Sequence, residues 1–210
     1  TAFAERFGHN ARRVVVMSET GSPLLAAAAE QQMHTIALPP NIGGRYSVFT
    51  PAGLLPLALV GFNPAALHAA AEESVERALH PDIKLNAAAL SALTQYYYYK
   101  QGIATHDTFV FSPALESYGK WYRQLLAESI GKTTNDGRTK VGITPTVSVG
   151  STDLHSVGQL YLGGLQTRLT TFVSVKGSAT IVVPTERAFP DVLPTLSGKS
   201  TETITDAILA

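Results

Sequence analysis

Short runs of β-branched residues alternate along the chain with longer segments in which apolar residues recur at helical spacing. The first run, RVVVM at residues 13–17, is bounded by turn-forming residues and is typical of a buried parallel strand. Ser22 followed by Pro23 predicts the start of an alanine-rich helix over residues 24–33, and residues 35–38 predict a second strand. The chain is therefore expected to begin with a strand–helix–strand unit.

Prolines and glycines over residues 39–44 interrupt this pattern, and Thr50 with Pro51 predicts the start of a very apolar helix. Further helices are expected over residues 65–79, 85–101, 112–130 and 153–162, and further strands over residues 108–111, 143–149, 169–175 and 179–183. This alternation favours an α/β fold with a mostly parallel sheet covered by helices on both faces. Ligand sites in such folds lie at the carboxyl ends of the strands.

Composition narrows the classes of function. The 16 Lys and Arg residues balance 16 Asp and Glu residues without a basic block, so no nucleic-acid footprint or polybasic membrane patch is visible. The longest apolar run, residues 52–62, is too short to span a membrane, and residues 1–13 lack the apolar region of a signal peptide. The absence of cysteine excludes thiol chemistry and fits a cytoplasmic protein. A small-molecule ligand is the expected partner.

Three polar segments within apolar sequence carry the candidate chemistry. Arg45 follows two glycines that allow a tight turn, and its guanidinium could stabilise negative charge that develops on a substrate. Glu128 lies near the end of a predicted helix and is a candidate general base, whereas His155 lies in the first turn of another and could exchange protons with a substrate oxygen. Each has an ordinary alternative, namely a surface ion pair, a solvated carboxylate and a capping or core histidine.

Other familiar signatures are missing from the sequence. The remaining histidines show no metal-ligand spacing with acidic residues, so no metal site is expected. No Walker loop, dinucleotide fingerprint or nucleophile elbow occurs, and no cofactor is therefore expected. The segment SGKST at residues 197–201 lacks the upstream glycine of a phosphate loop and is better explained as a turn before a helix.

Taken together, the three segments resemble motifs of the glucose-6-phosphate isomerase family in its bacterial form. The string GGRYSVFTPAGLLPLALVG, which begins at Gly43, is similar to the family's GGR(Y/F)S segment and the helix after it. ESIGK, beginning at Glu128, resembles the ESxGK base motif, and STDLHSVGQ, beginning at Ser151, resembles the histidine motif. The resemblance extends from about Val14 to Thr171 and weakens toward the C-terminus.

The resemblance implies a role for each segment in aldose–ketose isomerisation of glucose 6-phosphate and fructose 6-phosphate, a step of glycolysis and gluconeogenesis. Glu128 would move a proton between C1 and C2 through a cis-enediol intermediate, His155 would assist ring opening, and Arg45 would stabilise the intermediate. Gly44 and Gln124 fall at substrate-binding positions. The family also implies a homodimer in which His155 reaches the active site of the neighbouring subunit.

The family carries two sugar isomerase (SIS) domains of three-layer αβα architecture, and this chain matches only part of that arrangement. Residues 1–42 would be the C-terminal part of a first SIS domain, and residues 43–210 the crossing helices with a second SIS domain. The family's phosphate-binding loops and C-terminal lysine have no counterpart here, so the chain is expected to be a fragment with little activity alone. The alternative is a SIS-type module that binds sugar phosphates without turnover.

Overall fold

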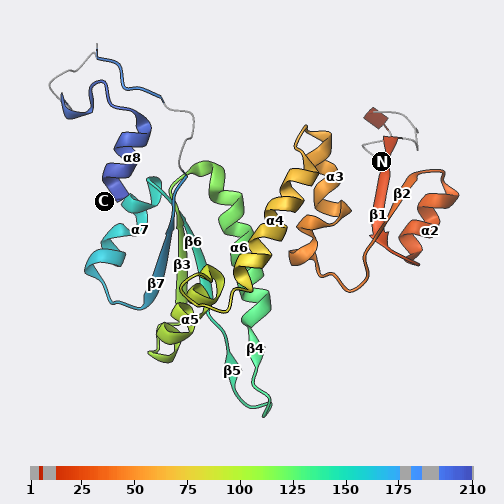
Figure 1. Ribbon diagram of the computed structural model, residues 1–210, viewed down its shortest axis with the longest axis horizontal. Helices are drawn as coiled ribbons and strands as arrows, with labels where there is room; N and C mark the ends of the chain where they lie inside the picture. Colours follow the sequence, from red (N-terminus) through yellow and green to blue (C-terminus); the bar gives the residue numbers. More distant parts are fainter. Residues whose placement is uncertain (1–4, 7–12, 176–180, 186–193, 210) are drawn as a thin grey trace. The chain divides into compact units, whose positions relative to one another are not determined.

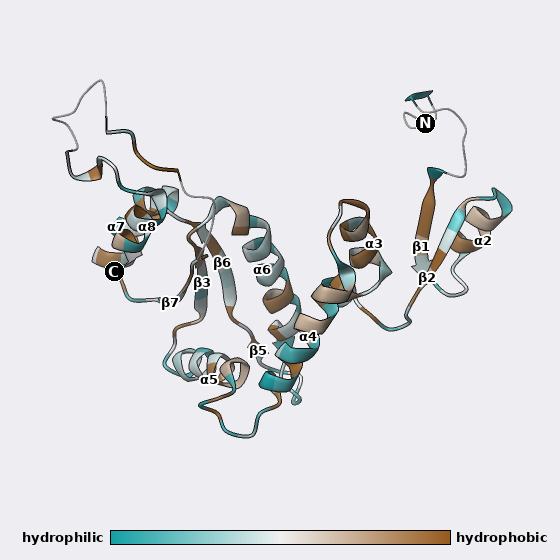
Figure 2. Cartoon of the chain, turned by 45° about the horizontal axis from the view of Figure 1, so that its top comes forward, coloured by the Kyte–Doolittle hydropathy of each residue, from teal (hydrophilic) through white to brown (hydrophobic). Residues whose placement is uncertain are grey.

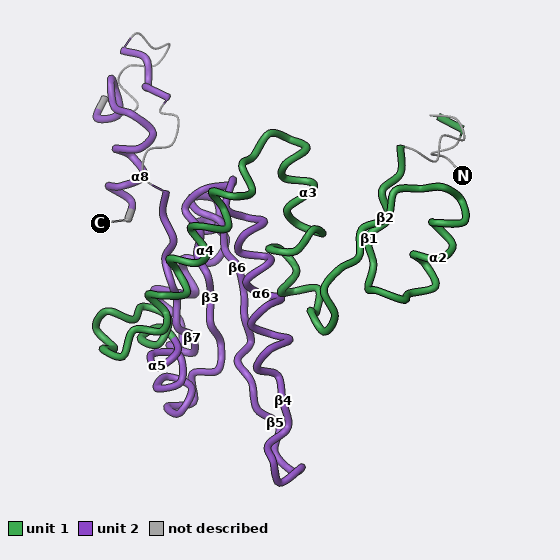
Figure 3. The backbone as a smooth tube through the Cα atoms, turned by 45° about the vertical axis from the view of Figure 1, so that its right-hand side comes forward, with its two compact units in different colours: residues 1–91 green, residues 92–210 purple. Residues whose placement is uncertain are grey.

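The computed structural model describes residues 5–6, 13–175, 181–185 and 194–209 (Figure 1). The chain divides into two compact units, residues 1–91 and residues 92–210 (Figure 3). The division falls inside helix α5 (Ala87–Lys100), which begins in the first unit and continues into the second. The predicted domain boundary between residues 42 and 43 lies within the first unit, and it stays a prediction.

The first unit begins with the predicted strand–helix–strand motif. Strand β1 (Val15–Glu19) pairs in parallel with β2 (His34–Leu38), and α2 (Pro23–Glu30) connects them. The Ser22 hydroxyl caps α2 by accepting a hydrogen bond from the Leu25 N–H at 3.3 Å. The prediction made from the apolar pattern and from the Ser-Pro cap is confirmed.

A 3₁₀ segment and two helices follow β2 in the same unit. They are η2 (Gly44–Phe49), α3 (Pro51–Leu59) and α4 (Pro64–Ala78). Figure 2 shows α3 as the most uniformly apolar helix of this unit, in agreement with the run of leucine, proline and alanine in its sequence. The Asn63 side chain caps α4 by accepting from the N–H groups of Ala65 and Ala66.

A three-stranded parallel sheet forms the centre of the second unit. Strand β3 (Thr105–Val110) lies between β6 (Thr144–Val149) and β7 (Arg168–Val173). Phe109 and Val110 are almost completely buried on the central strand. The core of this unit is therefore built around β3.

Helices cover both faces of this sheet. Val110 faces α6 (Glu116–Ile130), because its side chain lies 3.6 Å from the Cβ position of Gly119. Phe109 points to the other face, where its ring meets Tyr161 of α7 (Thr152–Gly163) edge-on, with centroids 6.5 Å apart. The layers are thus helix, sheet and helix, and the predicted α/β fold with a parallel sheet is confirmed.

Three features can be compared with the predicted elements. A short antiparallel hairpin of β4 (Lys132–Thr133) and β5 (Lys140–Val141) replaces the loop expected after α6. The strand predicted at residues 179–183 lies partly outside the described residues, and its described part forms only an isolated bridge between Val182 and Ser200. The helix expected near Glu202 is present as α8 (Thr201–Leu209).

Candidate active site

Arg45 is held in a turn that packs against the following helix. Thr50 is buried between the two, where its hydroxyl donates to the Ser47 carbonyl at 2.7 Å and accepts from the Ala52 N–H at 3.2 Å. A Cβ atom on Gly53 would lie 2.2 Å from the Val48 carbonyl oxygen, so no side chain fits there. The turn that holds Arg45 therefore packs closely against α3.

The guanidinium of Arg45 lies over the ring of Tyr46, with Cζ 4.7 Å from the ring centroid, and the Arg45 residue is half-buried. Gly44 is exposed, and its carbonyl oxygen accepts a hydrogen bond from the Ser47 hydroxyl at 2.7 Å. Among the described residues, no atom other than those of Gly44 and its chain neighbours lies within 4 Å of a Cβ atom built on Gly44, so a methyl group would fit at this position.

Glu128 lies in the last turn of α6, and its side chain is exposed. The amide nitrogen of Gln124, one turn earlier, donates to Glu128 Oε1 at 2.9 Å. The Lys132 ammonium donates to the main-chain carbonyl oxygen of Glu128 at 3.4 Å. Gln124, expected to contact substrate, is thus bonded to the carboxylate that is the candidate base.

His155 lies in the first turn of α7 and is also exposed. Asp153 fixes the start of this helix, since its carboxylate accepts from the Val149 N–H at 2.6 Å and from the Ser156 hydroxyl at 2.8 Å. Ser151 occupies the N-cap position but makes no capping hydrogen bond. Asp153 therefore ties the end of β6 to the helix that carries His155.

Glu128 and His155 lie at opposite ends of the strands of the same sheet. Helix α6 begins beyond the carboxyl end of β3 and returns toward the amino ends of the strands, where Glu128 is found, whereas α7 begins just beyond the carboxyl end of β6 (Figure 1). The 15 residues of α6 correspond to a length of about 22 Å. One copy of this unit does not bring the two side chains together.

Two buried polar residues on β3 escaped the sequence-based predictions. His106 is only 3% exposed; its Nε2 atom lies 2.8 Å from the Thr171 hydroxyl, and burial lowers its pKa despite the neighbouring charge of Asp107. Asp107 is fully buried and accepts from the Thr146 hydroxyl at 2.5 Å. These contacts bridge the strands of the sheet and have no counterpart in the sequence pattern.

No group of three or more potential metal ligands occurs within the described ranges. In the same part of the chain, no helix has both the length and the apolar character needed to cross a membrane.

Comparison with known proteins gives one consistent family. A family model described as phosphoglucose isomerase matches residues 21–183. A glucose-6-phosphate isomerase of Carboxydothermus hydrogenoformans is 40% identical over 160 residues, which cover 75% of this chain and 34% of that relative. One from Parabacteroides distasonis is 36% identical over 196 residues, covering 91% of this chain and 42% of the relative. The chain thus spans about a third to two fifths of the length of these curated relatives.

Solved structures agree on the fold. A hypothetical protein from Thermus thermophilus superposes with a TM-score of 0.88 at 28% identity, over 97% of this chain and 49% of that one. A glucose-6-phosphate isomerase from Chlamydia trachomatis superposes with a TM-score of 0.81 at 21% identity, over 99% of this chain and 39% of that one. At that identity the second match speaks for the fold alone.

Proposed function

The chain belongs to the phosphoglucose isomerase family, and on that premise we propose that it supplies part of the active site of an enzyme that interconverts glucose 6-phosphate and fructose 6-phosphate. The observation that carries the proposal is that one family match, over residues 21–183, spans all three candidate segments. Those segments provide a cation, a carboxylate and an imidazole, which are the groups that proton transfer through an enediol requires.

In this proposal, Glu128 takes the proton from C2 of the open-chain aldose and returns it to C1, while the hydroxyl proton of O2 is transferred to O1, so that the carbonyl moves from C1 to C2. Arg45 stabilises the negative charge of the enediolate. His155 donates a proton to the ring oxygen as the bond between C1 and that oxygen breaks, and the O1 hydroxyl loses its proton as the C1 carbonyl forms. Gly44 contributes an open backbone surface beside Arg45. Gln124 orients the carboxylate of Glu128 through the 2.9 Å hydrogen bond and contacts the substrate from the same turn of α6.

The test is a coupled assay of fructose 6-phosphate conversion, made on this chain and on a protein that holds it within a full-length isomerase. Glu128→Gln in that protein is expected to lower kcat by at least about 100-fold, because a general base is removed. Glu116→Gln on the same helix is the matched control, since its exposed ion pair with Lys120 contributes little. Unchanged activity of Glu128→Gln would overturn the assignment.

The chain alone is expected to show little or no turnover, because no segment of it resembles the family's phosphate-binding loops. If the full-length protein binds glucose 6-phosphate but does not convert it, the alternative of a non-catalytic sugar-phosphate module is correct. Incorporation of solvent tritium into the product tests the enediol route separately. The location of the enzyme in the cytoplasm and the domain division at residues 42 and 43 belong to the same proposal.

Glu128 and His155 lie at opposite ends of the strands of one sheet, and this separation supports a homodimer with shared sites. Each site would take Glu128 from one subunit and His155 from its partner. Mixing inactive Glu128→Gln and His155→Ala full-length proteins under exchange conditions should then restore activity. With random assortment half of the dimers are mixed, and each has one native site, so recovery should reach about a quarter of the native level.

Two controls accompany the mixing experiment. Each variant alone, carried through the same exchange, should stay inactive. Formation of mixed dimers is followed with two distinguishable tags. If mixed dimers form and no activity returns, each site draws both groups from one subunit, and the shared-site proposal fails.

A further inference from the structure

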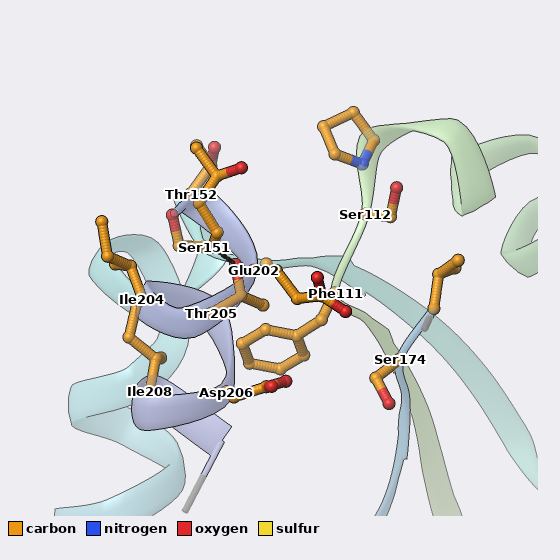
Figure 4. Close-up of a pocket in the computed structure, with 14 residues that line it drawn as sticks. Phe111, Ser112, Ser151, Thr152, Ser174, Glu202, Ile204, Thr205, Asp206 and Ile208 are labelled. Atoms are coloured by element: carbon orange, nitrogen blue, oxygen red, sulfur yellow. Dashed lines mark hydrogen bonds between the residues drawn. The ribbon is translucent and has the colours of Figure 1, made fainter. Parts of the chain in front are cut away.

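A cavity of about 390 Å³ lies in the second unit where the three parallel strands end (Figure 4). Its floor is formed by the residues that follow β3, β6 and β7, among them Phe111, Gly150 and Ser174, and α8 contributes the opposite wall. The volume falls within the range of about 300–1,000 Å³ that is typical of small-molecule sites. The carboxyl ends of parallel strands are also where open α/β sheets bind ligands.

Several hydroxyl groups line the cavity and are available to a ligand. Within the described part of the chain, no hydrogen bond is made by the side chains of Ser112, Ser151, Thr152 or Ser174. Ser112 and Ser151 occupy N-cap positions, where a serine ordinarily accepts from a backbone N–H, yet neither does so. Each hydroxyl can donate one hydrogen bond and accept two, so the wall offers several unused positions.

The charges around the cavity disfavour a phosphate as its occupant. Glu202 and Asp206 of α8 belong to the lining, and among the described residues no lysine, arginine or histidine does. The positive ends of the helices that begin at the sheet edge are weaker, with about half an elementary charge each. Carboxylates and hydroxyls without a cation suit a neutral ligand rich in hydroxyl groups.

An aromatic face completes the lining. Figure 4 shows the ring of Phe111 between α8 and the ends of the strands. This ring stacks on that of Phe109, with centroids 5.1 Å apart and planes 26° from parallel. A rigid apolar face next to polar groups matches a sugar, which presents C–H groups on one face and hydroxyls at its edge.

We propose that this cavity binds an uncharged sugar or polyol. It is separate from the Glu128 end of the unit, because Glu128 lies at the amino ends of the strands. Its wall includes Ser151 and Thr152, in the cap and first turn of the helix that carries His155. A bound ligand would therefore contact the start of α7.

The test is a titration of the chain with D-glucose, D-fructose and sorbitol, followed by saturation-transfer NMR, with inorganic phosphate as the charged comparison. Saturable binding of at least one neutral compound in the millimolar range is expected, with no competition from equimolar phosphate. Thr205→Leu should weaken that binding at least about tenfold, because leucine fills the cavity from α8 and removes a hydroxyl. Thr203→Leu, on the same helix but outside the lining, should leave it unchanged.

The design separates this site from any other sugar site. Ser174→Leu fills the cavity from the residue after β7 and replaces Thr205→Leu if the latter shifts the unfolding transition of the unit. A neutral sugar bound near Glu128 would be indifferent to both substitutions, and that result would overturn the proposal. The absence of saturable binding by all three compounds, or displacement of the bound compound by equimolar phosphate, would overturn it as well.

Discussion

A methyl group at Gly119 should destabilise the protein, although this residue lies inside a helix, where alanine is ordinarily preferred to glycine. It is buried on α6 against the sheet, and a Cβ atom there would lie 2.7 Å from Val147 Cγ1 and 3.5 Å from Val147 Cγ2. A valine side chain is restricted at χ1, so turning Val147 Cγ1 away from the new methyl group costs energy. Relief therefore requires either a less favourable rotamer of Val147 or a shift of α6 away from β6.

The expected effect follows from two opposing terms. Overpacking of a well-packed core costs typically 1–3 kcal/mol, so about 2 kcal/mol is a central value. Replacing a helical glycine by alanine stabilises the helix by about 1 kcal/mol. Gly119→Ala should therefore lower the free energy of unfolding by about 1 kcal/mol.

Gly158 on α7 is the matched control. It is also buried inside a helix, but a Cβ atom there would meet no atom within 4 Å in the described structure. Gly158→Ala should thus raise the free energy of unfolding by about 1 kcal/mol. The two variants should differ by about 2 kcal/mol, and helix propensity cancels from that difference.

Urea unfolding followed by tryptophan fluorescence measures both variants in the relevant part of the chain. Trp121 is the single tryptophan of the protein and lies on α6, so its signal reports the second unit. If Gly119→Ala proves as stabilising as Gly158→Ala, then α6 does not pack against β6 as closely as the structure indicates. The placement of α6 against the sheet, and with it that of Glu128, would then be wrong.

Three further changes have defined outcomes. Thr50→Ala removes the hydroxyl that accepts from the Ala52 N–H and should lower the free energy of unfolding by about 0.5–2 kcal/mol, measured by urea unfolding followed by circular dichroism. Thr50→Ser keeps a hydroxyl at this position and should lose much less stability. Burial lowers the pKa of His106 in the folded state below its ordinary value of 6.5, so the unfolded state binds a proton at a pH where the folded state does not. The free energy of unfolding should therefore fall as the pH drops below about 6.5. It should fall less in His106→Gln. Gln124→Met should lower kcat/KM of the full-length enzyme about fivefold, because it removes a charge-assisted hydrogen bond worth about 1 kcal/mol at an exposed site. Gln124→Glu should lower kcat/KM further, because it places a like charge beside Glu128.

Where local chemistry decided an element, the sequence sufficed to predict it. Ser22 with Pro23 and Thr50 with Pro51 each begin a helix at the expected residue. The reason is that the capping side chain and the helix it caps lie within a few residues of each other.

Strand β3 was predicted too short, as residues 108–111, because its first half is polar. His106 and Asp107 do not look like residues of a fully buried strand. Their partners, Thr171 and Thr146, come from two other strands that lie 65 and 39 residues away in sequence. Only the tertiary pairing makes this polar stretch compatible with the core, so no local pattern could reveal it.

The hairpin after α6 was missed for a related reason. Its strands have two residues each, too few to show an alternating pattern. What defines it is the turn around Asp136 and Gly137, where Gly137 has a φ of 71° and the Asp136 carboxylate accepts from the Arg138 N–H at 3.0 Å. The Asp-Gly pair was the available signal.

The separation of Glu128 from His155, by contrast, follows from connectivity alone. A helix that joins two parallel neighbouring strands must run back from their carboxyl ends to their amino ends, so the end of α6 lies near the amino ends of the strands. The helix that follows the second strand must begin near the carboxyl ends of the strands, which is where His155 is found. Any sequence with one functional residue late in the first helix and another early in the second meets the same constraint. Within one copy of this unit such a pair lies apart, and the strand order is therefore what leads us to propose a site shared between two copies.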